Sequence, residues 1–157
     1  MTALGLQKKG YQTIIVEKEK AIGNYSEKID ITEEIGLESV LKEYKIKPEL
    51  TSNISHWHAG KESFVFKSKI KDLFFIRGKK EKSLERQLFN RAVKKGADYK
   101  LSVKVKFQNN KIFIDKKEIK ARIVIGADGV NSIVTKFCMP EEKKKNNSGL
   151  WSILQTP

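Results

Sequence analysis

The chain has 157 residues, 32 Lys and Arg against 19 Asp and Glu, and hence a net charge of +13, with two His and one Cys. This length suits one domain of ordinary size, and an apolar share of 39% argues against a chain that is disordered throughout. The single thiol, Cys138, excludes an intramolecular disulfide and a cysteine metal cluster. No apolar run approaches the roughly 20 residues of a membrane span, and the N-terminal residues lack a secretory signal pattern, so we expect a cytoplasmic protein.

The lysines are scattered singly and in pairs, mostly beside acids, and the only triple is Lys143–Lys145. This distribution predicts solvated faces and no specific nucleic-acid site, because a single-strand binder needs cations interleaved with stacking aromatic residues. Two expectations remain open for the charge. One is weak association with an anionic membrane surface, and the other is a basic module that binds polyanions.

Residues 3–9 predict a helix that ends at Gly10, followed by a strand over 13–16. This strand is apolar and β-branched without alternation, as in a parallel sheet covered on both faces. A helix followed by a strand is an unusual start for a domain, so we expect the chain to begin inside a βαβ unit.

A helix is predicted after Thr32, whose side chain is suited to cap its first turn. This helix would have acids in its first turn and Lys42 and Lys45 near its end, which complements the helix dipole. Two short aromatic-rich strands are predicted over 63–66 and 71–77, joined by a polar link and ended by Gly78.

The clearest helix is predicted over 83–95, where apolar residues recur at helical spacing and Gly96 ends the segment. Strands over 100–107, 111–114 and 119–125 follow, separated by polar turns. The stretch 141–149 is polar and of low complexity, and 150–154 has no domain left to pack into, so we expect the chain to be cut at this end as well.

Two motifs carry chemistry. Glu17 and Lys18 follow the buried strand, where a carboxylate in dinucleotide-binding folds accepts hydrogen bonds from ribose hydroxyls. The run Ile123–Val134 takes an apolar strand into the turn Gly126-Ala127-Asp128-Gly129 and then a helix start, which brings backbone N–H groups and one carboxylate together. A simpler alternative for Asp128 is that it only caps this helix.

The run Gly-Ala-Asp-Gly-x-x-Ser-x-Val resembles the second flavin-contacting motif of FAD-dependent oxidoreductases related to aromatic-ring hydroxylases and geranylgeranyl reductases. Residues 3–20 resemble the stretch after the first glycine motif of that family, and Arg77 with the helix 83–95 and Gly96-Ala97 resembles a further shared segment. The three matches occur in the family's order and span most of residues 3–137.

The resemblance implies that Glu17, with Lys18 beside it, holds the adenosine ribose and that Arg77 lies near the flavin ribityl chain or the diphosphate. It implies that Asp128 binds the ribityl chain in the turn Gly126–Gly129, whose glycines allow close approach. The family's first strand and Gly-x-Gly-x-x-Gly turn are absent from this sequence, and Thr135 stands where many relatives carry Arg, with Lys136 the nearest substitute.

The implied fold class is α/β, a partial Rossmann-like FAD-binding domain with a β-meander and part of a substrate-domain sheet. We expect 1–49 to form a partial βαβ unit, 50–76 strands of the substrate sheet, 77–137 the rest of the FAD domain, and 138–157 a polar tail. The implied cofactor is FAD, with NADPH or ferredoxin as electron donor.

The implied function is flavin-dependent reduction of isoprenoid double bonds by the parent protein, with this chain inactive alone. An FAD-dependent aromatic monooxygenase and a non-catalytic fragment are the alternatives. The flavin performs the chemistry in such enzymes, so the sequence nominates no catalytic acid or base. His56 and His58 occupy alternate positions and would share one face of a strand, but they lack a third ligand, which disfavours a metal site, and Cys138 is interpreted as an inert thiol.

Overall fold

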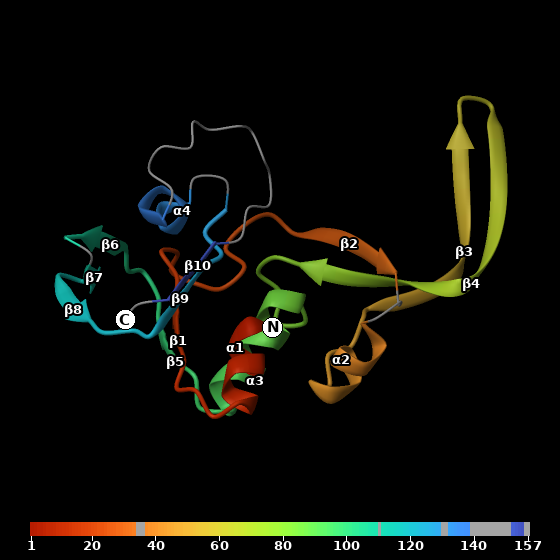
Figure 1. Cartoon of the computed structure of the whole chain (residues 1–157). Coiled ribbons are helices and arrows are strands. Elements are labelled where there is room, and N and C mark those ends of the chain that lie inside the picture. Colours follow the sequence, from red (N-terminus) through yellow and green to blue (C-terminus); the bar gives the residue numbers. More distant parts are fainter. Residues whose placement is uncertain (34–36, 110, 130–131, 139–151, 156–157) are drawn as a thin grey trace. The chain divides into compact units, whose positions relative to one another are not determined.

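Figure 1 shows the computed structural model of the chain, which describes residues 1–33, 37–109, 111–129, 132–138 and 152–155. The protein is mixed α/β with several small sheets, and it divides into two compact units, Met1–Ser102 and Val103–Pro157. No helix in the described ranges has the length and apolar character needed to cross a bilayer. Glu17, Lys18 and Arg77 lie in the first unit, and the Gly126–Gly129 turn lies in the second.

The described part of the first unit contains two sheets and three helices. In chain order its elements are α1 (Thr2–Lys8), β1 (Ile14–Val16), β2 (Lys28–Glu33), α2 (Glu38–Glu43), β3 (Leu50–Ala59), β4 (Glu62–Arg77), α3 (Leu84–Lys94) and β5 (Asp98–Lys100). Strands β1 and β5 pair in parallel, whereas β2, β4 and β3 form an antiparallel sheet in that order. The predicted helices 3–9 and 83–95 and the strand 13–16 are therefore confirmed, each within one or two residues.

One face of the end of β4 is buried, and this face builds the core of the unit. Leu73 and Phe75 alternate with half-buried residues and point to the same side of the sheet. They belong to a cluster with residues of α1, α3 and the segments after α2 and α3, namely Leu4, Tyr44, Ile46, Ala92 and Ala97. Ser83 caps α3 by accepting a hydrogen bond from the Arg86 N–H at 3.4 Å.

Two predictions in this unit are wrong. Thr32 does not cap a helix, because it lies in β2 opposite Leu73, and α2 begins only at Glu38. The alternation of Ile29 and Ile31 with polar residues is the strand signal that the capping interpretation overlooked. The two short strands predicted over 63–66 and 71–77 are one strand, β4, and its partner β3 lies in the range 50–76 that was expected to supply strands but was not delimited as an element of its own.

The ends of β3 and β4 form a long hairpin, which projects from the sheet in Figure 1. A register shift between Ser52 and Ile54 interrupts the ladder, since Ser52 lies opposite Asp72 whereas Ile54 lies opposite Lys67. Such an irregularity bends a strand and changes its twist. Beyond it, the ladder continues to Ala59 opposite Glu62.

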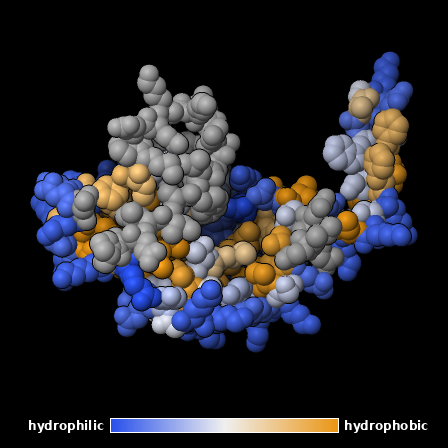
Figure 2. Space-filling view, viewed as in Figure 1, coloured by the Kyte–Doolittle hydropathy of each residue, from blue (hydrophilic) through white to orange (hydrophobic). Residues whose placement is uncertain are grey.

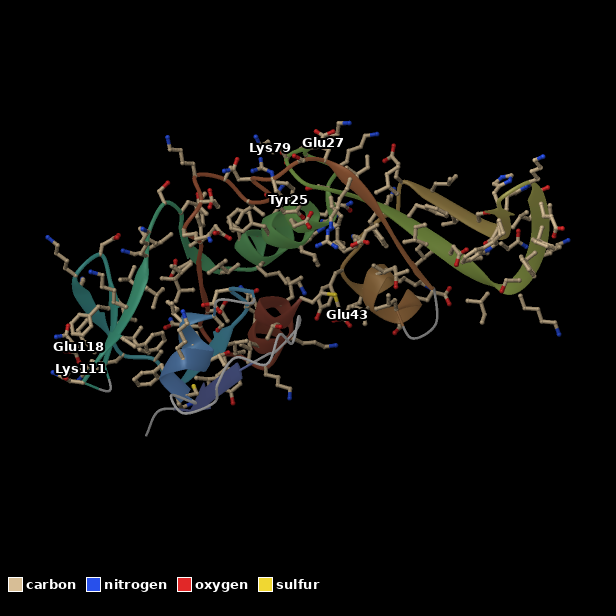
Figure 3. The ribbon with its side chains drawn as sticks, turned by 90° about the horizontal axis from the view of Figure 1, so that it is seen from above. Tyr25, Glu27, Glu43, Lys79, Lys111 and Glu118 are labelled. Atoms are coloured by element: carbon tan, nitrogen blue, oxygen red, sulfur yellow. The ribbon has the colours of Figure 1, made fainter. Side chains whose placement is uncertain are left out.

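The second unit contains a meander, a strand pair and a helix: β6 (Val105–Gln108), β7 (Lys111–Ile114), β8 (Lys117–Ile119), β9 (Ile123–Gly126), α4 (Ile133–Cys138) and β10 (Ser152–Gln155). Strands β6, β7 and β8 are antiparallel neighbours, and Lys111 pairs with Glu118 across the meander at 2.9 Å. Figure 3 labels both side chains. Ile112 and Ile114 are buried on one face of β7, and the ring of Phe107 on β6 stacks on that of Phe137 on α4 at 4.6 Å.

The predicted meander is confirmed in outline, with two corrections to its ends. The strand expected over 100–107 is divided into β5 and β6, and the strand over 119–125 is divided into β8 and β9. The segment 150–154, expected to have nothing to pack into, contributes β10, which pairs antiparallel with β9 over Ser152–Gln155. The polar stretch 141–149 lies outside the described residues.

Candidate functional site

Glu17 follows β1 directly, at the end where parallel strands present their carboxyl termini. Its N–H continues the β1–β5 ladder by donating to the Lys100 carbonyl oxygen at 2.9 Å. Its carboxylate Oε1 accepts from the Glu19 N–H at 3.1 Å, which folds the next residues back over the strand end. The Glu19 carbonyl then accepts from Ser102 N–H, and the half-buried Glu17 is thereby fixed in place while Lys18 stays exposed.

Arg77 ends β4 and is held by carboxylates from two other elements. Its Nη1 donates to Asp30 Oδ2 of β2 at 2.6 Å, and its Nε donates to Glu85 Oε1 of α3. Glu85 Oε1 also accepts from the Tyr25 hydroxyl, and its Oε2 accepts from the Gly78 N–H at 3.3 Å. We name Tyr25, Asp30, Arg77 and Glu85 the arginine cluster, and it joins the segment before β2, the sheet and α3.

The ionisation of the arginine cluster follows from these contacts. Burial alone would raise the pKa of Glu85, but the hydrogen bonds from Tyr25 and Arg77 outweigh burial and leave its pKa below the ordinary 4.5. Burial opposes the charge of Arg77, but its hydrogen bond to Glu85 raises its pKa above the ordinary value. Burial and the hydrogen bond to Glu85 also raise the pKa of Tyr25. These contacts therefore favour the charged forms of Arg77 and Glu85 and the neutral form of Tyr25.

Two glycines allow the chain to cross itself beside this cluster. Gly23 and Gly78 both have positive φ, and a Cβ at Gly23 would overlap the carbonyl oxygen of Gly78. A Cβ at Gly78 would lie 3.1 Å from Glu27 Cα. Figure 3 labels Tyr25 and Glu27 on the crossing segment, and Glu27 pairs with Lys80 at 2.8 Å.

The Gly126–Gly129 turn connects β9 to α4. Gly126 is buried against α4, where an added Cβ would lie 2.7 Å from Val134 Cβ, so this glycine lets strand and helix pack closely. Asp128 is exposed, and its Oδ2 accepts from the Ile133 N–H at 2.6 Å. Gly129 has a φ of +79°, and no atom of the residues that the structure describes lies within 4 Å of a Cβ built there. Ala127 is exposed, and Ser132 Oγ accepts from Thr135 N–H at 3.0 Å.

The hydrogen bond from the Ile133 N–H makes Asp128 a cap of α4, because it satisfies a backbone donor in the first turn of that helix. This is the contact expected if Asp128 only caps the helix. This contact engages Oδ2 of a carboxylate that is otherwise exposed, and it fixes the side chain beside the open surface at Gly129. Gly126 serves packing against Val134, so its small size has a reason within the chain itself.

In the first unit the predicted site residues contact residues that the sequence did not single out. Arg77 contacts Asp30 and Glu85, and Glu17 contacts its own loop, so these two predicted residues of the first unit form separate sets of hydrogen bonds. Sequence reasoning missed Tyr25, Asp30 and Glu85. Glu85 had a signal, as an acid in the first turn of the helix that follows Arg77, but the pairing is a long-range contact that no local pattern encodes.

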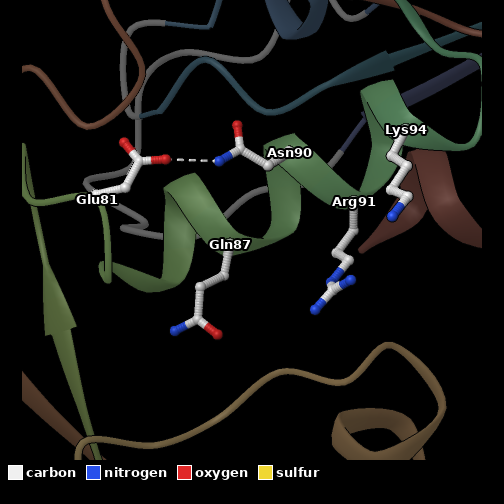
Figure 4. Close-up of a pocket in the computed structure, with 5 residues that line it drawn as sticks. All are labelled: Glu81, Gln87, Asn90, Arg91 and Lys94. Carbon is white, nitrogen blue, oxygen red and sulfur yellow. Dashed lines mark hydrogen bonds between the residues drawn. The ribbon is translucent and has the colours of Figure 1, made fainter.

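Other polar sites offer less. His56 and His58 are exposed on β3 opposite Val65 and Ser63, and among the described residues no group of three His, Cys, Asp or Glu side chains has metal-site geometry. An open depression of about 210 Å³ lies beside α3, and Figure 4 draws the side chains that line it. It is lined by Glu81, Gln87, Asn90, Arg91 and Lys94, and the side chains of Glu81 and Asn90 hydrogen-bond to each other at 2.8 Å.

Among known proteins, the similarity that was found is one of fold. No protein-family model and no curated protein sequence matches this chain. A solved structure of a mutant of MHPCO is similar with a TM-score of 0.66 and 18% sequence identity over 83% of this chain. The match covers 36% of the MHPCO chain, so this chain spans about a third of that protein's length. The architecture is therefore that of part of the MHPCO fold.

Proposed function

We propose that this chain forms part of the FAD site of a flavin-dependent oxidoreductase. The likeness to MHPCO, a flavin-dependent aromatic hydroxylase, over 83% of the chain is the observation that carries the proposal. In this proposal β1 and β5 belong to a Rossmann-like parallel sheet, residues 1–49 and 77–137 serve the cofactor, and 50–76 belong to a substrate-domain sheet. Bound flavin would supply the redox chemistry, while the chain binds and orients it.

Glu17 fits the adenosine ribose in this proposal. Its carboxylate is half-buried at the carboxyl end of a parallel strand, where nucleotides bind in open α/β sheets. The Glu19 N–H fixes its orientation, and two acceptor oxygens suit a pair of vicinal hydroxyls. Exposed Lys18 beside it adds positive charge near the phosphates.

Asp128 fits the ribityl chain. Its carboxylate is exposed and oriented by the Ile133 N–H, and among the described residues no atom crowds the position of a Cβ at Gly129. A carboxylate accepts hydrogen bonds from several hydroxyls, which suits a polyol. The cap on α4 and the proposed ligand contact use the same side chain, so the cap pre-orients the group that binds.

Arg77 suits the ribityl hydroxyls better than the diphosphate. Asp30 and Glu85 together balance its charge, so the arginine cluster has no positive excess to offer an anion. A guanidinium has five N–H donors, so with two of them engaged it can still donate hydrogen bonds to the oxygen of an uncharged hydroxyl. The diphosphate then depends on a glycine turn that this sequence does not contain.

For the substrate we keep two candidates. We propose reduction of isoprenoid double bonds, because the residues before Arg77 resemble the geranylgeranyl reductases. The second candidate is hydroxylation of an aromatic substrate, which the activity of MHPCO favours. If the parent protein consumes oxygen in a one-to-one ratio with ring hydroxylation, the second candidate, hydroxylation of an aromatic substrate, is correct.

A titration of the 157-residue chain with FAD tests the proposal. Each charge-assisted hydrogen bond to the glycine turn contributes about 1.5–3 kcal/mol, so without about three of them we expect binding roughly three to six powers of ten weaker than in a site with that turn. Asp128→Asn keeps an oxygen that can cap α4 but removes the charge, and we expect it to weaken binding about tenfold or more. Asp115→Asn, in an exposed turn of the same unit, is the control and leaves the affinity unchanged. Equal affinity of both variants would contradict the role of Asp128.

A further inference from the structure

The hairpin formed by residues 54–67 of β3 and β4 has an aromatic face with nothing packed on it among the described residues. Trp57 lies directly opposite Phe64, and Ser55 lies directly opposite Phe66, so the three rings lie on one side of the hairpin. They are 64%, 47% and 56% exposed. Figure 2 shows apolar side chains along this projecting hairpin. Single exposed rings are common on proteins, but three adjacent ones mark an interaction surface.

The hairpin and the strand that leads from it also carry an excess of lysines over acids. Lys61, Lys67, Lys69 and Lys71 are all exposed, and Glu62 is the one acid between Ile54 and Lys71. None of these four lysines takes part in an ion pair among the described residues, whereas elsewhere lysines of both units pair with glutamates at 2.8–3.3 Å. Residues 54–71 contain four lysines and one glutamate, so these 18 residues have a net charge of +3.

We propose that this hairpin docks the chain on an anionic lipid surface, with Trp57, Phe64 and Phe66 in the interfacial layer and the four lysines at the headgroups. Tryptophan favours the boundary between water and lipid, because its ring is amphipathic. Apolar side chains combined with lysines are the pattern of elements that lie in the membrane interface. Long lysine side chains reach headgroups from beside an inserted face.

The arrangement of the two kinds of residue favours lipid over nucleic acid. Residues on the face of the three rings include Ala59 and Glu62, which lie opposite each other. Lys67 lies on the other face, opposite Ile54. Stacked bases would need cations beside the rings for their phosphates, and this face offers an acid instead. A lipid interface needs only that the rings insert while the lysines remain in the headgroup layer.

Sedimentation of the full chain with lipid vesicles tests the proposal. Vesicles of phosphatidylcholine with 30% phosphatidylserine are compared with phosphatidylcholine alone, and Trp151→Phe leaves Trp57 as the sole tryptophan, so its emission reports insertion. We expect binding to the anionic vesicles with a blue shift of Trp57 emission, and little binding to the neutral ones. Phe64→Ser with Phe66→Ser is expected to lower the partition coefficient at least tenfold.

Two matched variants separate the hairpin from general basicity. A triple variant changes Lys67, Lys69 and Lys71 to Gln. It should lower the partition coefficient onto anionic vesicles on the order of a hundredfold, since each lysine near an anionic surface contributes about fivefold. The same change at Lys116, Lys117 and Lys120 of the second unit should lower it much less. Ile29→Ser with Ile31→Ser removes two side chains that are 68% and 59% exposed on β2 and should leave binding unchanged.

Several results would overturn the proposal. Equal losses in the two lysine triples would assign the binding to net charge alone. A Trp57 emission that does not shift on anionic vesicles would exclude insertion of the aromatic face. A blue shift that depends on protein concentration without lipid, with dimers in sedimentation velocity, would assign the face to a second copy of the chain. Circular dichroism of each variant shows whether its fold is retained.

Discussion

Replacing Glu85 by alanine should lower the free energy of unfolding by about 2–3 kcal/mol, because it leaves Arg77 and Tyr25 with their donors facing an empty position. Glu85 accepts from Tyr25, Arg77 and Gly78, and it joins α3 to β4 and to the segment before β2. Urea unfolding followed by circular dichroism measures the change. Glu81→Ala is the control, because Glu81 lies just before α3 and is an exposed partner of Arg86 on that helix, and its loss should cost less than about 1 kcal/mol. Equal effects of the two variants would contradict the structural role of the arginine cluster.

The same carboxylate predicts the direction of a pH effect. Its pKa is lower in the folded chain than its ordinary 4.5, so the folded state favours the ionised form. The stability that this preference contributes is fully present above about pH 4.5 and is lost as the pH falls through the lowered folded pKa. Glu85→Gln does not titrate, so its stability should fall less steeply than that of the wild type below pH 4.5.

Replacing Phe75 by alanine should have the largest effect on stability, about 3–5 kcal/mol, because the ring is 3% exposed in the cluster of the first unit. A loss of this size approaches the total stability of many small domains. Phe64→Ala on the same strand is the matched control, since that ring lies on the projecting part of the hairpin and is 47% exposed. We expect its cost to stay below about 1 kcal/mol in the same urea titration. A cost at Phe64 as large as at Phe75 would show that the hairpin packs on the core in solution.

Local patterns predicted the elements whose signals are strong within a few residues. The helix 83–95 has apolar residues at helical spacing and a serine cap, and the β-branched strand before Glu17 has no competing pattern. Strand β3 was predicted only as part of the range 50–76, because its polar residues, such as Ser52, Asn53 and His58, hide the alternation, and pairing with β4 supplies the order that its sequence lacks. Thr32 was assigned to a cap because Glu33 and Glu34 follow it, although its alternation with Ile31 marks a strand.

The site residues show the same division. Glu17 and Asp128 lie where local patterns place them, at the end of a strand and in the turn before a helix. The partners of Arg77 come from β2 and α3, 47 and 8 residues away, and no spacing rule predicts them. The packing role of Gly126 against Val134 was likewise invisible, since it depends on how closely α4 approaches β9.

The most direct test of the proposed FAD site uses the two halves of the cofactor separately. Adenosine monophosphate carries the ribose assigned to Glu17, and flavin mononucleotide carries the ribityl chain assigned to Asp128. Ligand-observed NMR titration of the 157-residue chain measures both weak affinities. We predict that Glu17→Gln weakens binding of the adenosine half about tenfold without affecting the flavin half, and that Asp128→Asn does the reverse. Loss of both ligands in both variants, or of neither ligand in either variant, would contradict the assignment of these carboxylates to a flavin dinucleotide site.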